Sequence, residues 1–351
     1  LGEMPSPSDV CKNIGSVWAA CLQHMEQRSS GSMGEVFHQS QQQASKAYLD
    51  SVLGCHMQLT ADHLQAARRA RIALRVAREF GTQDSNEYQA CLDYYRKMML
   101  LPEEWPVGEL LAQGEECNGV TQGRNAPGVF LMREVENASD LQGLFDACHK
   151  VTYTRDRHGG AVPTSLQIEG VTHCMNDQVF RQYMETRERL RSRMTGLATQ
   201  SACREAIGLY ADSFEQEFTA GELLTTEYLR TREGEPSALR VEALDVETCN
   251  EAFAFHGTAS TAAHDIAKGD FRLSLAGSSA GTLYGRGLYF AQNPSKSDEY
   301  CSPDAEGLCT MLVCRVLLGR MKYTDEVTPD AARLEAMAKP IPVTGQKNFN
   351  F

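Results

Sequence analysis

Three short motifs between residues 256 and 300 constrain this 351-residue chain more than any other feature. The first, HGT at 256–258, directly follows the strand-like run AFAF at 252–255. The second is YGRGLYFA at 284–291, and the third is SKSDEY at 295–300. Glycine lets a ligand come close to the backbone, and tyrosine rings offer flat faces on which another ring can stack. Their order and spacing favour one ligand site over several unrelated features.

The residue pattern along the chain predicts an α+β protein, with helices first and a mixture of strands and helices later. Residues 102–128, which are rich in Gly and Pro, are expected to form a linker. Gly81 is expected to end the second helix. The expected helices are 35–56, 60–81, 84–101, 139–148, 177–194, one or two within 196–232, 261–267 and 294–300, and the expected strands are 151–156, 165–171, 252–255, 288–291 and 310–318.

The charge of the chain argues against nucleic acid as a partner. The formal net charge is −12, whereas a phosphate-binding surface needs clustered Lys and Arg. Five arginines lie on the expected helix 60–81 and could face an acidic partner. A solvated helix face, with the aliphatic stems covering apolar neighbours, is the interpretation we favour.

The cysteines do not indicate a metal site. Twelve are scattered without a single CxxC pair, and zinc ligands usually come in such pairs. The closest group, Cys301, Cys309 and Cys314, lacks that spacing and has no neighbouring histidine. We expect no metal and reduced thiols in an intracellular protein, cytoplasmic or nuclear. No secretory leader and no apolar run near the roughly 20 residues of a membrane span are evident, so no membrane partner is expected.

The side chains of the three motifs suit the cleavage of NAD. Breaking the bond between nicotinamide and ribose develops positive charge at the anomeric carbon, as in glycoside cleavage. An enzyme must hold the nicotinamide ring flat, grip its carboxamide and fix the ribose hydroxyls. Tyr289 and Tyr300 can flank the ring, Gly257 and Ser297 can bond the carboxamide, and His256 can bond a ribose hydroxyl.

Each of these residues also has a purely structural interpretation. A histidine at a strand end is often a satisfied core residue, a tyrosine in a strand usually packs in the core, and Ser-x-Ser before a helix is usually an N-cap. Gly285 and Gly287 alone indicate a turn, and they are no dinucleotide fingerprint because no helix opens there. The occurrence of all of them in one order favours the NAD site.

From about Lys150 onward, the chain resembles the catalytic domain of the poly(ADP-ribose) polymerase-like ADP-ribosyltransferases. The resemblance implies a split antiparallel β-sheet related to diphtheria toxin and a His-Tyr-Glu triad. It implies that His256 and Tyr289 are catalytic, and that 269–277 resembles the donor loop of the mono-ADP-ribosylating branch. The cofactor-binding residues that it implies are His256, Gly257, Thr258, Arg272, Tyr289, Ser297 and Tyr300, with Thr258 and Arg272 toward the adenosine.

The resemblance also implies a division of the chain. We expect a mainly helical N-terminal region of unknown role at 1–140 and a catalytic domain at 141–351, with a helical insertion at about 196–247. No residue is a candidate for the triad Glu, since Glu299 and Glu306 lie beside the tyrosine motif. The tail 342–351 resembles the loop before that Glu. We therefore expect a piece of a longer chain, cut before the Glu and the closing strands.

The leading hypothesis is an NAD-dependent protein ADP-ribosyltransferase that releases nicotinamide and modifies protein acceptors, with mono transfer favoured over poly. Without the Glu, NAD binding with weak transfer and no polymer is expected. The alternative is a catalytically weak or inactive NAD-binding or interaction module of the same fold. A third hypothesis is a helical interaction protein whose function lies in residues 1–140.

Overall fold

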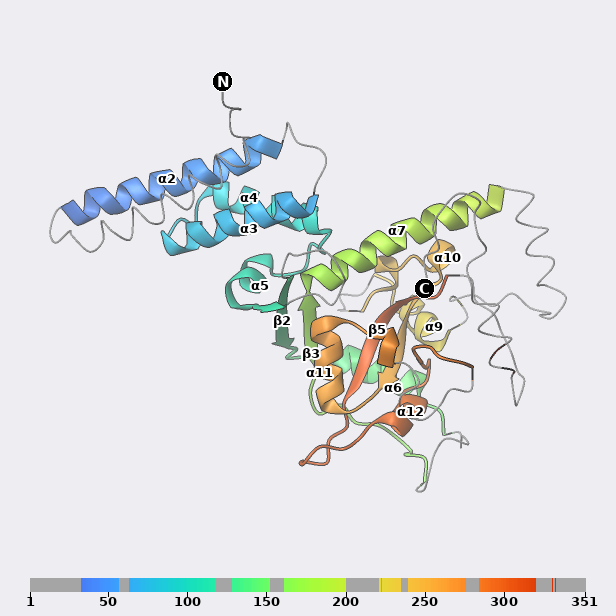
Figure 1. Ribbon diagram of the computed structural model, residues 1–351. Coiled ribbons are helices and arrows are strands. Elements are labelled where there is room, and N and C mark those ends of the chain that lie inside the picture. Colours follow the sequence, from blue (N-terminus) through green and yellow to red (C-terminus); the bar gives the residue numbers. More distant parts are fainter. Residues whose placement is uncertain are drawn as a thin grey trace. The chain divides into compact units, whose positions relative to one another are not determined.

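The computed structural model describes residues 33–56, 63–117, 128–151, 161–199, 221, 223–234, 239–275, 284–319, 330 and 332. The chain divides into two compact units. The first comprises residues 1–131 with Met175–Arg181, and the second comprises Met132–Cys174 with the chain from Gln182 onward (Figure 1). In the described residues, no helix is both long and apolar enough to cross a membrane.

The first unit is built on packed helices. Leu49, Leu74, Tyr95 and Leu110 are among its fully or almost fully buried side chains, and each comes from a different helix. Ser85 caps one of these helices by accepting a hydrogen bond from the Tyr88 N–H. The helices are α2 (Met33–His56), α3 (His63–Glu79), α4 (Asn86–Met99) and the short α5 (Val107–Gln113).

The helices expected near 35–56, 60–81 and 84–101 are confirmed. Gly81 has a φ of 66°, a conformation that glycine adopts freely, and it follows the end of α3 as expected. The linker expected at 102–128 is wrong in part, because α5 and strand β1 (Glu115–Cys117) lie within it. Val107, Leu110 and Leu111 are spaced for one helix face and are buried, so their packing outweighs the neighbouring Pro and Gly.

The arginines of α3 do not form one uniform face. Arg68 and Arg75 are exposed, and Arg75 pairs with Glu79 in a solvent-exposed ion pair. Arg78 instead donates a hydrogen bond to the Leu111 carbonyl at 2.8 Å. Arg78 therefore supports the fold and is not available to a basic surface.

A small antiparallel sheet contains two of the points where the chain passes from one unit to the other. Its strand order is β1-β2-β3, with β2 at Gly128–Glu134 and β3 at Thr172–Asn176. In β1 and β2, Glu115 lies opposite Phe130. Helix α7 (Asp177–Thr199) begins directly after β3. These strands and helices confirm the α+β class.

The second unit is centred on the antiparallel pair β4 (Glu251–Gly257) and β5 (Met311–Leu317). Phe255 of β4 is fully buried and packs edge-on against Phe145, with ring centroids 5.0 Å apart. The helices of this unit besides α7 are α6 (Ser139–Cys148), α9 (Leu224–Arg230), α10 (Val246–Cys249), α11 (Ser260–Gly269) and α12 (Pro294–Ser297), with 3₁₀ turns η2 (Val241–Ala243), η3 (Leu273–Leu275) and η4 (Asp298–Tyr300).

A buried carboxylate ties the start of β4 to helix α7. The Glu251 side chain is fully buried and accepts hydrogen bonds from the Tyr183 hydroxyl at 2.7 Å and from the Asp245 N–H at 2.6 Å. It is also paired with Arg187 at 2.8 Å and with Arg315 of β5. A buried carboxylate needs such compensation, so α7, β4 and β5 are joined at one charged centre.

Two strands expected in the second unit are wrong. Residues 165–171 are not paired as a strand; the Gln142 amide bonds the Leu166 carbonyl and the Ile168 N–H instead. Residues 288–291 contribute only a bridge between Ala291 and Phe255. A short apolar run has the composition of a strand whether or not a neighbour pairs with it.

Several expectations lie outside the described residues or stay predictions. Of the strand expected at 151–156, only Val151 is described, and most of the chain at 200–220 and after 319 is not. The expectation of missing closing strands therefore stays a prediction. So do the domain limits 1–140 and 141–351 and the insertion at 196–247.

Candidate active site

The site is assembled around the end of β4, where His256 is half-buried. Two hydrogen bonds between the backbones of Phe255 and Ala291, 2.8 and 2.9 Å long, align the tyrosine motif with this strand. They bring the Tyr289 carbonyl to 2.8 Å from Nδ1 of His256. A carbonyl oxygen only accepts, so Nδ1 must carry the hydrogen. In neutral His256, Nε2 is then left as a hydrogen-bond acceptor.

Gly257 is the position at which the first and third motifs meet. A Cβ atom built on Gly257 would lie 1.8 Å from the Ser297 carbonyl oxygen and 3.0 Å from Sγ of Cys301. No side chain fits in that space, which explains why glycine is needed here. Ser297 itself is only 3% exposed. The expected carboxamide-binding pair, Gly257 and Ser297, is thus in direct backbone contact.

The Tyr289 hydroxyl has a structural task. It donates a hydrogen bond to the Gly285 carbonyl at 2.6 Å and accepts one from the Tyr284 N–H at 3.2 Å. Gly285 has a φ of 94°, so the loop needs glycine at this turn. The hydroxyl closes the turn at Gly285, which leaves the aromatic ring as the part of Tyr289 suited to contact a ligand.

Tyr300 is the more open of the two tyrosines, with 38% of its surface exposed. The Lys296 ammonium lies 5.2 Å from its ring centroid, within the range of a cation–π contact. Lys296 also pairs with Glu299 at 2.7 Å, and the Glu299 side chain is 1% exposed. Glu299, the carboxylate nearest in sequence to Tyr300, is therefore engaged with Lys296.

Cys301 packs next to the backbone of Gly257 and Ser297. Its thiol donates to the Thr310 carbonyl at 3.2 Å and contacts the Ser297 carbonyl at 3.6 Å. Burial, with smaller contributions from Cys309 and Asp298, raises the pKa of Cys301 to about 12. The thiol stays protonated near neutral pH, which suits a packing role and not that of a nucleophile. No group of three or more metal-ligating side chains occurs in the described part of the chain.

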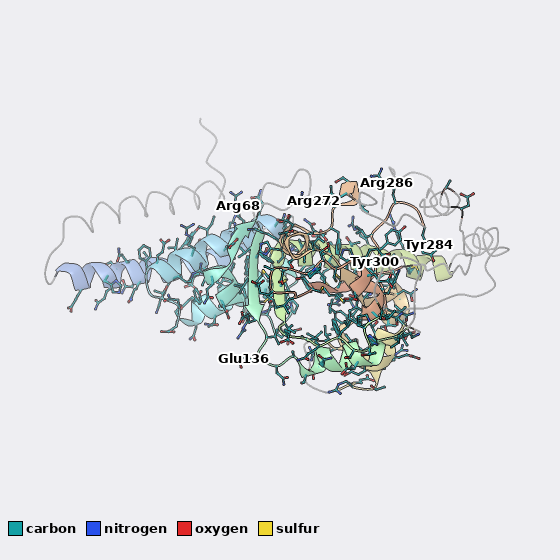
Figure 2. The ribbon with its side chains drawn as sticks, turned by 90° about the horizontal axis from the view of Figure 1, so that it is seen from below. Arg68, Glu136, Arg272, Tyr284, Arg286 and Tyr300 are labelled. Atoms are coloured by element: carbon teal, nitrogen blue, oxygen red, sulfur yellow. The ribbon has the colours of Figure 1, made fainter. Side chains whose placement is uncertain are left out.

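The remaining expected ligands lie beside this centre. Thr258 directly follows Gly257 and is half-buried, whereas Arg272 is exposed. Phe271, the residue before Arg272, packs edge-on against the His256 ring with centroids 5.0 Å apart. In the view of Figure 2, Arg272, Tyr284, Arg286 and Tyr300 fall along the same part of the second unit.

Sequence reasoning missed two features of this site. Phe271 and Phe290 form a cluster of three rings with His256, and Lys296 lies over Tyr300. The ring cluster joins segments that are far apart in the sequence, so no local pattern could reveal it. The spacing of Lys296, Glu299 and Tyr300 within one helical turn was a usable signal, since residues three or four apart share a helix face.

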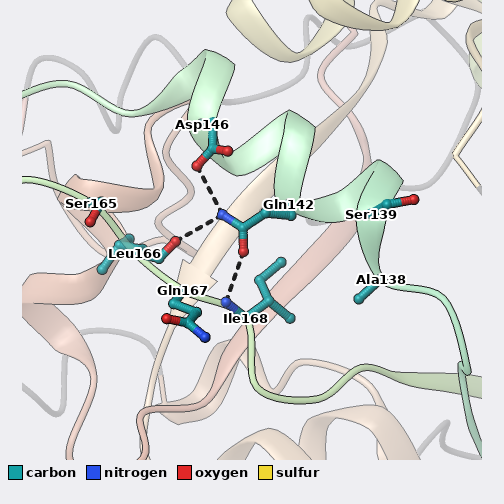
Figure 3. Close-up of a pocket in the computed structure, with 8 residues that line it drawn as sticks. All are labelled: Ala138, Ser139, Gln142, Asp146, Ser165, Leu166, Gln167 and Ile168. Atoms are coloured by element: carbon teal, nitrogen blue, oxygen red, sulfur yellow. Dashed lines mark hydrogen bonds between the residues drawn. The ribbon is translucent and has the colours of Figure 1, made fainter.

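A separate recess of about 490 Å³ opens beside α6 (Figure 3). Its lining includes Ser139, Asp146 and the extended residues 165–168, and the Gln142 amide crosses it. None of the expected ligand-binding residues lines this recess. The recess is therefore distinct from the candidate site at the end of β4.

Comparison with known proteins relates one segment of the chain to a family. Residues 216–346 match the family described as "Poly(ADP-ribose) polymerase catalytic domain". This segment, less than half of the chain, is similar to that catalytic domain. All three motifs of the candidate site lie inside it. The domain match also begins within the expected insertion at 196–247, and α9 of that stretch bonds β4 through Thr225 and the Phe253 carbonyl at 2.7 Å.

Individual relatives of this polymerase-type domain match over short stretches. The chain is 44% identical over 71 residues to "Protein mono-ADP-ribosyltransferase PARP10" of Mus musculus, which is 20% of this chain and 7% of that protein. It is 38% identical over 81 residues to "Protein mono-ADP-ribosyltransferase PARP14" of Homo sapiens, covering 22% and 4%. It is 37% identical over 79 residues to "Poly [ADP-ribose] polymerase tankyrase" of Caenorhabditis elegans, again covering 22% and 4%. The matched regions thus span only a small part of these relatives.

Proposed function

We propose that the chain is an NAD-dependent protein ADP-ribosyltransferase that transfers ADP-ribose from NAD to a protein side chain and releases nicotinamide. The observation that carries this proposal is the contact of Gly257 with Ser297, beside His256 and Tyr289, within a polymerase-type catalytic domain. These four residues come from three separate motifs, and the resemblance to the family implies that these motifs bind NAD.

Each residue has a physical role in holding NAD. His256, with its hydrogen on Nδ1, offers Nε2 to a ribose hydroxyl. Gly257 offers backbone groups, and Ser297 a hydroxyl, to the carboxamide. Tyr289 and Tyr300 offer ring faces to the nicotinamide. Thr258 and Arg272 extend the site toward the adenosine and the diphosphate.

The close packing at Gly257 supports the proposal. Because Gly257 has no side chain, the Ser297 backbone can lie directly against it, and the two groups proposed to bond the carboxamide are held together. Tyr300 keeps 38% of its surface exposed, so part of its ring remains open to a partner. A planar aromatic amide suits that combination of an open ring and adjacent polar groups.

We favour mono over poly transfer. PARP10 and PARP14 are named as mono-ADP-ribosyltransferases, and the stretch 269–277 resembles the donor loop of that branch. Tankyrase, named as a polymerase, matches over a comparable length, so the relatives alone do not decide the point.

The second candidate function is a catalytically weak or inactive NAD-binding module. The burial of Glu299 favours it. With a side chain 1% exposed and paired with Lys296, Glu299 is poorly placed to stabilise a developing positive charge on a substrate. An NAD-binding protein without measurable transfer would support this candidate over the first.

The experiment is NAD titration, followed by measurement of NAD hydrolysis and automodification, on wild type and site variants. We expect Tyr289→Ala to weaken NAD binding about tenfold or more, because a stacking face is lost. Tyr289→Phe keeps the ring and should lose less. Ser297→Ala should cost about two- to tenfold, as for one hydrogen bond. Equal binding and hydrolysis by wild type and Tyr289→Ala would refute the site.

A further inference from the structure

Asp270 adopts a backbone conformation that is reserved almost entirely for glycine. Its φ is 68° and its ψ is 169°, at the residue that ends helix α11. Gly269 directly precedes it, so the chain places glycine one position before the strained residue. The Asp270 N–H bonds the Ile266 carbonyl at 2.7 Å, and its carboxylate accepts from the Phe271 N–H at 2.7 Å. Such strain persists only where surrounding contacts enforce it.

The residue after Asp270 packs into a cluster of rings. The Phe271 ring meets His256 edge-on, with centroids 5.0 Å apart and an interplanar angle of 90°. It also meets Phe290 at 5.3 Å and 71°, and Phe290 contacts His256 at 5.6 Å. Edge-to-face pairs at these separations are favourable beyond the area they bury. The sharp turn at Asp270 directs Phe271 into this cluster.

The cluster restricts the imidazole from several directions. Nδ1 of His256 is hydrogen-bonded to the Tyr289 carbonyl at 2.8 Å, while Phe271 and Phe290 contact the ring. The hydrogen bond alone leaves the imidazole able to tilt about it. The Phe271 ring stands at right angles to the imidazole, with centroids 5.0 Å apart, so a tilting imidazole would lose this edge-to-face contact.

We propose that Phe271 is a positioning residue, which fixes the His256 imidazole so that Nε2 points to the ligand, and that the strained turn at Asp270 delivers it. This inference rests on the proposed function, because His256 matters only if it holds NAD. Phe271 acts through His256, whose ring it contacts. The conformation of the segment 271–275 and the orientation of His256 are thereby coupled before any ligand binds.

The test compares Phe271→Leu with wild type in the full chain, by two readouts. The first needs no ligand: histidine side-chain ¹⁵N NMR, with His256→Asn used to assign the signal. Wild-type His256 should show hydrogen on Nδ1 and none on Nε2, and Phe271→Leu should shift and broaden these signals, because the ring can then tilt about its hydrogen bond to Tyr289. The second is NAD titration, in which Phe271→Leu should bind about fivefold more weakly or worse. In hydrolysis, KM should rise more than kcat falls.

The matched control is Phe180→Leu. Phe180 packs against Trp105 with ring centroids 5.0 Å apart, and both belong to the first unit, away from the described contacts of His256. It should lose stability without changing the His256 signal. An unchanged His256 signal and unchanged NAD affinity in Phe271→Leu would overturn the proposal. A wild-type protein with the expected His256 signal that does not bind NAD would instead contradict the proposed function, and the NMR comparison would still decide the role of Phe271.

Substitutions of Asp270 test the turn separately. Glycine adopts this conformation freely, so Asp270→Gly should keep NAD affinity within about twofold and melt no lower than wild type. Valine is branched at Cβ and is poorly compatible with the conformation. Asp270→Val should lower the melting temperature, weaken NAD binding and disturb the His256 signal. If Asp270→Val matched wild type in all three measurements, the turn would not deliver Phe271.

Discussion

At the scale of single residues, Gly257 is where sequence and chemistry are most tightly linked. Its Cβ position lies 1.8 Å from the Ser297 carbonyl oxygen, which belongs to the backbone and cannot rotate away. We predict that Gly257→Ala lowers the free energy of unfolding by about 1–3 kcal/mol, as overpacking does. It should also weaken NAD binding, since Ser297 must move.

The chain supplies a matched control for this change. A Cβ on Gly287 would meet nothing within 4 Å. Gly287→Ala should therefore change the unfolding free energy by no more than about 0.5 kcal/mol in urea denaturation. If Gly257→Ala were as stable as Gly287→Ala and bound NAD normally, the close contact between the two motifs would have no functional meaning.

At the scale of elements, the site depends on how β4 is anchored at its other end. Glu251 begins β4, and its carboxylate joins α7, β5 and the turn at Asp245. On α7, Arg191 pairs with Asp245 at 2.8 Å. Burial opposes ionisation of Asp245, but hydrogen bonds from Arg191, Cys249 and the Thr248 N–H outweigh it and lower its pKa from 3.8 to about 2.

This lowered pKa predicts a specific dependence of stability on pH. Because the folded pKa lies below the unfolded one, the ionised Asp245 stabilises the fold fully above about pH 4, and that contribution is lost as the pH falls toward 2. Asp245→Asn keeps a side chain that can cap α10 but loses the charge. The melting temperature of wild type should exceed that of Asp245→Asn between pH 5 and 7, and the difference should shrink below pH 4.

The control is Glu247→Gln, which removes an exposed ion pair with Arg230 in the same unit. Such pairs contribute about 0–1 kcal/mol, so Glu247→Gln should follow the wild-type melting profile closely. A difference between wild type and Asp245→Asn that stayed constant from pH 7 to 2 would show that the charge of Asp245 does not anchor α7.

At the scale of the whole molecule, local signals predicted the elements better than their pairing. The helices α2, α3, α4 and α6 and the strands β4 and β5 follow from apolar periodicity and composition. Residues 165–171 and 288–291 have strand composition but lack a full strand partner, and α5 was hidden among Pro and Gly. Pairing depends on distant residues, which no short window contains.

The same reasoning explains what was and was not predicted of the site. His256, Gly257, Tyr289, Ser297 and Tyr300 stand in short motifs with recognisable chemistry. Phe271 and Phe290 meet His256 only because the fold brings three segments together. The backbone strain at Asp270 could not be predicted from the sequence. A positive φ at the end of this helix would be expected at Gly269, whereas it occurs at the next residue.

A crystal structure of the chain with bound nicotinamide would test the NAD site most directly. We predict that the nicotinamide ring lies between Tyr289 and Tyr300, with its carboxamide bonded to Gly257 and Ser297. Nicotinamide bound in the recess beside α6, or anywhere that leaves these two tyrosines without a ligand between them, would contradict it.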